Sequence, residues 1–192
     1  NQAQPTQTLP AALPPTPEAR VVELEWPVRL RMGESDIVRL ALVPSSEGYT
    51  ATAEFPEHPL DTTQLDVRRP EGYTLLAVAR LDGVGFDLSP SGDQVRAVPV
   101  GEGVSWRWSL TPRAPGMQRL TVSLLLRWEP EAGGTGAVRE SVAFGRGLDV
   151  RVTSFLGMGR PEALLLGLAG VLLGGGFSIF SLVGRGKART AA

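Results

Sequence analysis

Hydrophobic and polar residues alternate along the chain from residue 21 to residue 153, which is the pattern of half-buried β-strands. In VVELEWPVRLRM (21–32), one face is apolar and the other is charged. The charged face, expected to meet solvent, carries Glu23, Glu25, Arg29 and Arg31. Because Pro27 has no N–H for a ladder, this long strand should lie at a sheet edge or bend there. Further strands are predicted in DIVRLALVP (36–44), GYTATAEFP (48–56) and GYTLLAVARL (72–81).

A hairpin is predicted in GVSWRWSLTPRAPGMQRLTVSLLLRW (103–128). Alternating apolar residues mark one strand up to Leu110 and another from Leu120. The connection ends in Pro115 and Gly116, which suit the central positions of a type II turn because glycine accepts a positive φ. We therefore expect the two strands to pair directly through this turn.

The last β segment is AVRESVAFGRGLDVRVTSF (137–155). Its apolar residues are expected to share one face: Val138, Val142, Phe144, Leu148, Val150 and Val152. Gly145–Gly147 places an arginine between two glycines and predicts a β-bulge or a close backbone approach. We expect this bulge and Val28–Met32 to be exposed edge features that contact a partner.

About eight or nine strands with regular turn signals, and no helical period before Pro161, predict an all-β antiparallel sandwich. In strand spacing and in its tryptophan-bearing strands, the chain resembles the immunoglobulin-like and fibronectin-like modules of bacterial membrane-anchored proteins. The resemblance covers residues 21 to 153. The chain lacks the cysteine pair of antibody domains. It implies an immunoglobulin-like fold and transfers no functional residue.

One C-terminal transmembrane α-helix is predicted after the sandwich, because Ala163 to Val183 contains no charged residue. A helix of this length, at about 1.5 Å per residue, spans roughly 31 Å, close to a bilayer core of about 30 Å. The alternative is a buried core helix, which is usually shorter and keeps a polar face. The predicted organisation is a Pro-rich arm or linker (1–20), the sandwich (21–155), the transmembrane helix (161–184) and a short basic tail (185–192).

Small residues recur along this segment in steps of three and four, so that a helix would align them on one stripe. They are Ala163, Gly167, Gly170, Gly174, Ser178 and Ser181. Small residues let a second helix approach closely in lipid, and Gly170 with Gly174 forms the small-xxx-small pattern. The stripe predicts packing against a transmembrane helix of another subunit or of a second copy. The alternative is that glycine is simply common in membrane helices.

The residues that flank the segment predict its orientation. Arg185, Lys187 and Arg189 follow it, whereas only Arg160 and Arg151 lie close before it. The positive-inside rule then places the C-terminus in the cytoplasm and the β domain outside it. The alternative is a tail anchor with the β domain in the cytoplasm.

The first twenty residues contain five prolines and few large apolar groups, which is typical of an extended linker. A proline motif that a partner's groove binds is the alternative. Asn1 is not an initiator methionine, which favours a mature chain left by signal-peptide cleavage; a piece of a longer protein is the other interpretation.

Charge and cysteine content exclude several function classes. Sixteen of the nineteen Lys and Arg residues, but nineteen of the twenty Asp and Glu residues, precede residue 161, so the β domain is slightly acidic and no nucleic-acid partner is expected. The chain has no cysteine, so disulfides, thiolate metal sites and lipid attachment to cysteine are ruled out.

Candidate catalytic and metal-binding residues are few. His58 is the only histidine and lies between two prolines in FPEHP, where we expect an ordinary loop residue. Asp82, Asp87 and Asp93 could supply calcium ligands, but Asp-Gly is also a common turn dipeptide and the spacing matches no EF-hand, so we expect turns. No catalytic site, metal or cofactor is predicted.

Trp106 and Trp108 are two residues apart on one predicted strand and therefore point to the same face. Exposed aromatic residues can bind sugars, but these alternate with polar residues as core residues do, so we expect them in the core.

The resulting hypothesis is a non-catalytic, single-pass membrane protein that acts as an accessory or docking subunit of a membrane complex. Its partners would be the lipid bilayer and a neighbouring transmembrane helix. The first alternative is an anchored module that binds a ligand such as carbohydrate. The second is a cytoplasmic, tail-anchored scaffold, or the C-terminal part of a larger signalling protein.

Overall fold

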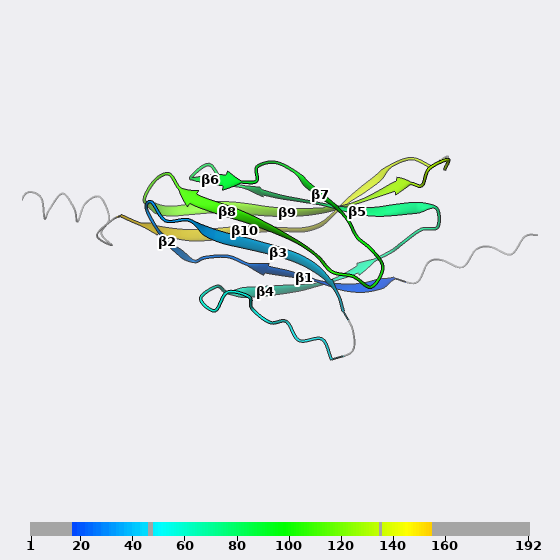
Figure 1. Cartoon of the computed structure of the whole chain (residues 1–192), viewed down its shortest axis with the longest axis horizontal. Coiled ribbons are helices and arrows are strands. Elements are labelled where there is room, and N and C mark those ends of the chain that lie inside the picture. Colours follow the sequence, from blue (N-terminus) through cyan, green and yellow to red (C-terminus); the bar gives the residue numbers. More distant parts are fainter. Residues whose placement is uncertain (1–16, 46–47, 135, 155–192) are drawn as a thin grey trace, which may run out of the picture.

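A computed structural model describes residues 17–45, 48–134 and 136–154, which form two five-stranded β-sheets packed face to face (Figure 1). The first sheet contains, in spatial order, β4 (Leu60–Val67), β1 (Glu18–Glu25), β3 (Asp36–Pro44), β8 (Val104–Pro112) and β6 (Phe86–Ser89). The second contains β2 (Arg29–Arg31), β10 (Arg139–Thr153), β9 (Gly116–Pro130), β5 (Tyr73–Asp82) and β7 (Gln94–Ala97). Neighbouring strands are antiparallel except β2, which pairs with β10 in parallel.

The core lies between the two sheets and is built from the alternate apolar residues of each strand. Leu24 of β1 and Leu40 of β3 are fully buried, as are Leu120 and Leu124 of β9 on the facing sheet. The alternation seen in the sequence therefore assigns the inward face of most strands correctly. The prediction of an all-β sandwich is confirmed for the described residues.

The spatial order of the strands matches that of immunoglobulin domains. β1, β3, β8 and β6 occupy the positions of strands A, B, E and D, and β10, β9 and β5 occupy those of G, F and C. Three strands are additional: β4 extends the first sheet beyond β1, β2 extends the second beyond β10, and β7 pairs with β5 although it follows β6 in the chain. The sandwich is thus immunoglobulin-like with added edge strands.

The predicted single strand over 21–32 is in fact two strands in different sheets. β1 ends at Glu25 and β2 begins at Arg29, so the chain crosses from the first sheet to the second at Pro27. The predicted bend at proline is confirmed. The edge position holds for β2 only, because β1 lies between β4 and β3.

The predicted hairpin of the two tryptophan- and leucine-rich strands is wrong. β8 belongs to the first sheet and β9 to the second, so the connection Arg113–Pro115 crosses between sheets and the strands do not pair. β9 pairs instead with β5 and β10. Gly116 does have the expected positive φ, 113°. Alternation of apolar residues identifies the inward face of a strand but not its neighbour, and both strands face the same core.

β10 is one continuous strand whose irregularity lies elsewhere than predicted. Its register shifts between Val142 and Phe144, whereas Gly145–Gly147 pairs regularly with β9. At Gly147 an added Cβ would lie 2.7 Å from a guanidinium nitrogen of Arg119, so the second glycine leaves room for that side chain. The bulge was therefore misplaced, and what approaches Gly147 is the arginine side chain rather than the predicted backbone, while nothing lies within 4 Å of a Cβ at Gly145.

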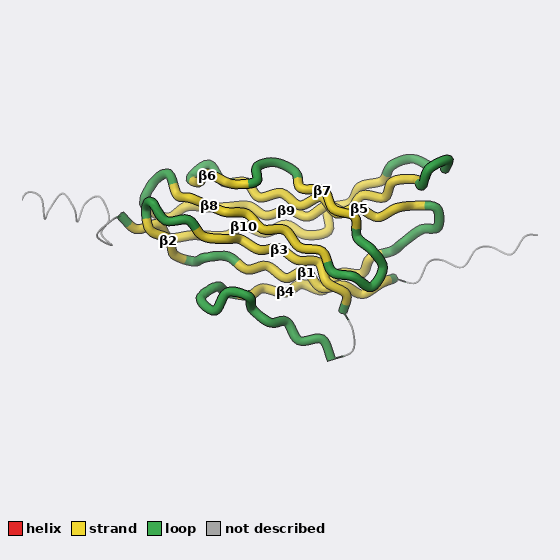
Figure 2. Tube along the Cα trace, viewed as in Figure 1, coloured by secondary structure: helices red, strands yellow, loops and turns green. Residues whose placement is uncertain are grey.

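Residues 48–56, predicted as a strand, form a loop, and the strand after them, β4, was not predicted (Figure 2). The loop alternates like a strand, yet its backbone joins no ladder. Of β4, only Val67 is fully buried, because its outer neighbour is solvent. An edge strand of this kind carries too few apolar residues for periodicity to detect it.

Within the described ranges, no helix is long and apolar enough to span a bilayer. The predicted transmembrane segment (161–184) and basic tail (185–192) lie outside those ranges, as does most of the Pro-rich arm.

Candidate functional site

The outer face of the first sheet carries a row of charged residues from three neighbouring strands. Glu25 of β1 pairs directly with Arg39 of β3, and Arg39 pairs with Arg107 of β8. Two arginines opposite each other repel, so this row needs a carboxylate beside them. Glu54, from the loop Gly48–Pro59, supplies it.

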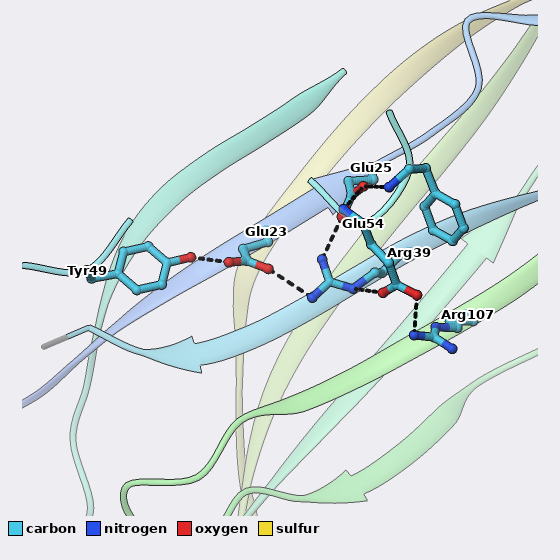
Figure 3. A network of polar contacts seen from close by, with 7 residues as sticks. Glu23, Glu25, Arg39, Tyr49, Glu54 and Arg107 are labelled. Carbon is cyan, nitrogen blue, oxygen red and sulfur yellow. Dashed lines mark hydrogen bonds and ion pairs between the residues drawn. The ribbon is translucent and has the colours of Figure 1, made fainter. Parts of the chain in front are cut away.

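Glu54 lies between the two arginines (Figure 3). Its Oε2 lies 3.1 Å from Nε of Arg39, and its Oε1 lies 2.5 Å from Nη2 of Arg107. Arg39 also contacts Glu23 at 3.0 Å and Glu25 at 2.7 Å. One guanidinium thus holds three carboxylates, two from β1 and one from the loop.

The loop backbone is bound to the same cluster. Glu25 is fully buried, and its Oε2 accepts the backbone N–H groups of Glu54 at 2.8 Å and Phe55 at 3.0 Å. Its other oxygen faces Arg39, so both oxygens of this buried carboxylate are satisfied. We call this loop, Gly48–Pro59, the clamped loop.

Tyr49 fixes the start of the clamped loop by donating its hydroxyl hydrogen to Glu23. Burial, together with the hydrogen bond to Glu23 and its negative charge, raises the pKa of Tyr49 to about 12. The hydroxyl therefore remains a donor throughout the physiological range. Burial alone would lower the pKa of Arg39, but hydrogen bonds and charge interactions with Glu23 and Glu25 raise it above its ordinary value.

We call the six side chains the ion network: Glu23, Glu25, Arg39, Tyr49, Glu54 and Arg107. Glu23 and Glu25 were expected to face solvent, but the clamped loop covers them and both are buried. The sequence does hold one signal for this. Val21 lies on the same outer face and is itself buried, and an apolar residue on a presumed solvent face indicates that the face is covered.

A buried arginine outside the ion network, Arg20, lies near the start of β1 and binds the β7–β8 connection. Arg20 is fully buried; it donates to the carbonyl oxygens of Glu102 at 2.8 Å and Pro99 at 2.6 Å, and it pairs with Glu18 at 2.7 Å. Glu18 also accepts from Arg69 at 2.7 Å. Burial would raise the pKa of Glu18, but the hydrogen bonds from Arg69 and Arg20 lower it below the ordinary value of 4.5.

Each carboxylate of the ion network faces a cation, an N–H or a hydroxyl, so the cluster acts as an ionic clamp. The loop that it holds remains partly exposed. Several loop side chains are exposed: Thr50, Thr52, Ala53, Pro56 and Glu57. A loop that is fixed on a rigid sheet while its tip stays exposed is the usual way in which a β-sandwich presents a binding surface.

The predicted helix-packing and orientation residues lie outside the described residues. They are Ala163, Gly167, Gly170, Gly174, Ser178 and Ser181, followed by Arg185, Lys187 and Arg189.

Trp106 and Trp108 are buried at 2% and 0% exposure, so the prediction that they belong to the core is confirmed and a sugar platform on them is wrong. Trp106 also donates its indole N–H to the carbonyl oxygen of Gln94 at 3.0 Å. This bond ties β8 in the first sheet to β7 in the second.

His58 lies in a loop, as predicted, and its side chain is 6% exposed. Its ring lies 5.0 Å from that of Phe55, and its Nε2 lies 3.3 Å from Oδ2 of Asp36. A half-open hollow of about 250 Å³ lies beside it. The hollow is lined by Pro27, Val28, Arg29, Asp36, Glu57 and His58.

The three aspartates considered for calcium lie beside arginines. Asp82 and Asp93 face Arg80 at 2.7 and 3.6 Å, and Asp87 pairs with Arg113, which lowers the pKa of Asp87. In the part of the chain that the structure describes, no three His, Asp or Glu side chains are grouped to hold a metal ion.

The predicted edge features are both exposed in part. Val28 is 44% exposed and precedes the edge strand β2, while Gly145 and Gly147 lie on the exposed face of β10.

No protein-family model matches the chain, and no curated protein matches it. Among solved structures, it is similar to the cupredoxin domain of amoB from Nitrosocaldus yellowstonii, with 15% identity, a TM-score of 0.34, and coverage of 70% of this chain and 86% of that one. It is also similar to the ASH / PapD-like domain 7 of human CEP192, with 9% identity, a TM-score of 0.33, and coverage of 80% of this chain and 98% of that one.

Proposed function

We propose that this chain is a non-catalytic, single-pass membrane protein whose immunoglobulin-like sandwich lies outside the cytoplasm and docks onto other subunits of a membrane complex. The observation that carries the proposal is the uncharged segment from Ala163 to Val183, followed by three basic residues within six positions of Val183. Such a segment is long enough to cross a bilayer, and its flanks favour a cytoplasmic C-terminus.

The sandwich supports a docking role through its clamped loop. Four charged side chains of the sheet hold this loop through its backbone and through its own Tyr49 and Glu54. Burying Glu23 and Glu25 is costly unless each is paired, so the ion network fixes one loop conformation rather than adding much stability. A fixed, exposed loop suits recognition of a folded partner, because little conformational entropy is lost on binding.

The small-residue stripe supports a second contact inside the bilayer. A segment that only anchors the protein would be as stable with leucine in place of Gly170 and Gly174. Glycines at this spacing allow another helix to approach within van der Waals contact. The proposed subunit therefore has two docking surfaces, one in the membrane and one on the sandwich.

The test is extraction of the tagged full chain from its native membrane in mild detergent, followed by mass spectrometry of the proteins that remain bound after size exclusion. A fixed set of membrane proteins at constant stoichiometry is expected. The variant Gly170→Leu/Gly174→Leu should lose them. Gly176→Leu is the matched control, because on a helix it would lie on the side opposite the stripe and should keep them.

A chain that elutes alone, or only with a second copy of itself, would contradict the accessory-subunit role. Recovery of the protein in the soluble fraction without detergent would contradict the membrane anchor itself.

A further inference from the structure

The end of the sandwich where β10 stops is well defined. The backbone N–H of Met32 donates to the carbonyl oxygen of Thr153 at 2.9 Å, and that of Arg151 donates to Val28 at 3.0 Å. β2 is thereby fixed beside the last residues of β10. Figure 1 shows this end opposite the start of β1, with the connections β2–β3, β5–β6 and β8–β9 gathered around it.

Three arginines lie on the outer face of this end. In the parallel pairing of β2 and β10, Arg29 is the neighbour of Arg151, and Arg31 is the neighbour of Thr153. The alternate residues Leu30 and Val152 are buried in the core, so all three arginines point away from it and are exposed. We call Arg29, Arg31 and Arg151 the basic end.

Like charges on directly adjacent strands destabilise a sheet, and here they are only weakly compensated by Glu34 and Glu57, which line the same hollow as Arg29 and Arg31. Within residues 17–45, 48–134 and 136–154, neither Arg29 nor Arg151 has a carboxylate oxygen within 4.0 Å. Arg31 faces Glu34 at 3.8 Å in a pair that is mostly exposed. By contrast, the arginines of the ion network each contact a carboxylate at 3.1 Å or less.

Exposed apolar side chains accompany these charges. Met117 of β9 is the direct neighbour of Arg151 and is 64% exposed, and Val84 in the β5–β6 turn is 97% exposed. The turn adjoins the start of β9, because a Cβ on Gly85 would meet Gln118. Arginine beside isolated apolar side chains is the combination found where proteins meet the headgroup region of a bilayer.

We propose that the basic end binds the anionic phospholipid headgroups of the membrane that anchors the chain, so that the sandwich stands on the bilayer with its opposite end outward. This inference rests on the proposed function, because it takes 161–184 as the anchor. Nine residues lie between Thr153 and Ala163, so ten Cα-to-Cα steps join them and span at most about 35 Å when fully extended. The described chain leaves the sandwich at the basic end, because β10 stops there beside β2, so a short connection to the anchor keeps this end close to the membrane. Guanidinium groups bind phosphate in bidentate fashion.

The contact also has a consequence for docking. With the basic end on the membrane, the start of β1 and the β7–β8 connection point away from the bilayer, and the clamped loop lies along the side of the sandwich (Figure 1). The loop then faces neighbouring proteins in the same membrane, which is where a partner subunit would be.

The test uses the full chain in phospholipid vesicles. Because the chain has no cysteine, Val84→Cys places a single spin label at the basic end, and Val100→Cys, 73% exposed, places a matched label in the β7–β8 connection. Vesicles of phosphatidylcholine alone, or with one part in three of phosphatidylglycerol, carry a nickel-chelating lipid that relaxes nearby labels. In the anionic vesicles, we expect strong relaxation at Val84→Cys and little at Val100→Cys.

Adding Arg29→Gln/Arg31→Gln/Arg151→Gln should return the Val84→Cys signal to its level in phosphatidylcholine, since each arginine near an anionic surface contributes roughly fivefold to binding. The control, Arg68→Gln/Arg96→Gln/Arg139→Gln, removes the same charge from exposed positions elsewhere and should leave the signal unchanged.

Equal relaxation of the Val84→Cys label in both vesicle types, or undiminished relaxation in the variant that lacks the three arginines, would overturn the inference. So would loss of a copurifying protein in that variant while the vesicle signal persists, which would assign the arginines to an acidic protein surface. Failure of the chain to float with any vesicle would instead overturn the proposed anchor.

Discussion

Arg39 and Glu25 face each other directly across β3 and β1, with Nη1 and Oε1 2.7 Å apart. Glu25 is fully buried, although the strand pattern assigns it to the solvent face. It is buried because the clamped loop crosses the outer face of the first sheet and places two backbone N–H groups on its second oxygen. The pair therefore links sheet and loop. Removing Arg39 leaves the buried Glu23 and Glu25 without their counterion, whereas removing Glu25 leaves Arg39 still paired with Glu23 and Glu54.

Arg39→Met should be strongly destabilising, by about 3–5 kcal/mol, because it leaves Glu23 and Glu25 without a counterion under the clamped loop. Urea unfolding of the full chain in detergent, followed by tryptophan fluorescence, measures the free energy of unfolding. The control is Arg119→Met: its contact with Asp149 is 3.9 Å long and exposed, so a change below about 1 kcal/mol is expected. Equal effects of the two substitutions would show that the ion network contributes no more than a surface pair.

We expect the folded chain to lose stability in acid because of Glu18. Its hydrogen bonds from Arg69 and Arg20 lower its pKa in the folded chain below the ordinary 4.5. An unfolded chain therefore takes up a proton first as the pH falls, which favours unfolding. The contribution of Glu18 is present above pH 4.5 and is lost as the pH falls through its folded pKa. Glu18→Gln should flatten the pH dependence of the urea midpoint in this window, whereas Glu34→Gln, in an exposed pair, should not.

We expect the folded chain to lose stability at alkaline pH because of Tyr49. Its pKa is raised to about 12 by burial and by Glu23, whereas an unfolded tyrosine ionises near 10. Its stabilising contribution is therefore present below pH 10 and is lost between pH 10 and pH 12. Absorbance titration at the phenolate band should show a step near pH 12 that disappears in Tyr49→Phe. A tyrosinate signal from Tyr49 near pH 10 would mean that it does not donate to Glu23.

Periodicity in the sequence predicted which side of a strand faces the core, because burial of one face demands alternation. Leu24, Leu40, Trp108 and Leu124 all follow it and are fully buried. The break at Pro27 was also predictable, since a residue without an N–H cannot continue a central strand.

Strand partners and covered outer faces could not be predicted in this way. β8 and β9 both present apolar residues to one core, and nothing in that pattern distinguishes a hairpin from a crossing between sheets. Glu23 and Glu25 alternate as solvent-facing residues do, and only contacts 14 to 30 residues away along the chain make them buried. The candidate site was missed for this reason: it exists only once the clamped loop is in place.

Burial of Trp106 and Trp108 predicts their response to quenchers. In Trp26→Phe/Trp128→Phe, the only remaining tryptophans are Trp106 and Trp108, and iodide should quench them weakly. In Trp106→Phe/Trp108→Phe, fluorescence comes from the half-buried Trp26 and Trp128, and quenching should be several-fold stronger. Strong quenching of the first variant would place an indole ring on the surface and reopen the question of a sugar platform.

The proposed orientation predicts which cysteines an impermeant reagent can reach. Val100→Cys is exposed at the end of the sandwich opposite the basic end, so a membrane-impermeant maleimide should label it in intact cells. Ala191→Cys, two residues after Arg189, should be labelled only after permeabilisation, because the basic tail favours the cytoplasm. The native chain, which has no cysteine, gives the background. The reverse pattern would place the sandwich in the cytoplasm, where the basic end would meet the inner leaflet. The two proposals are therefore tested separately, because this labelling measures the orientation of the chain and the spin labels measure the contact with lipid.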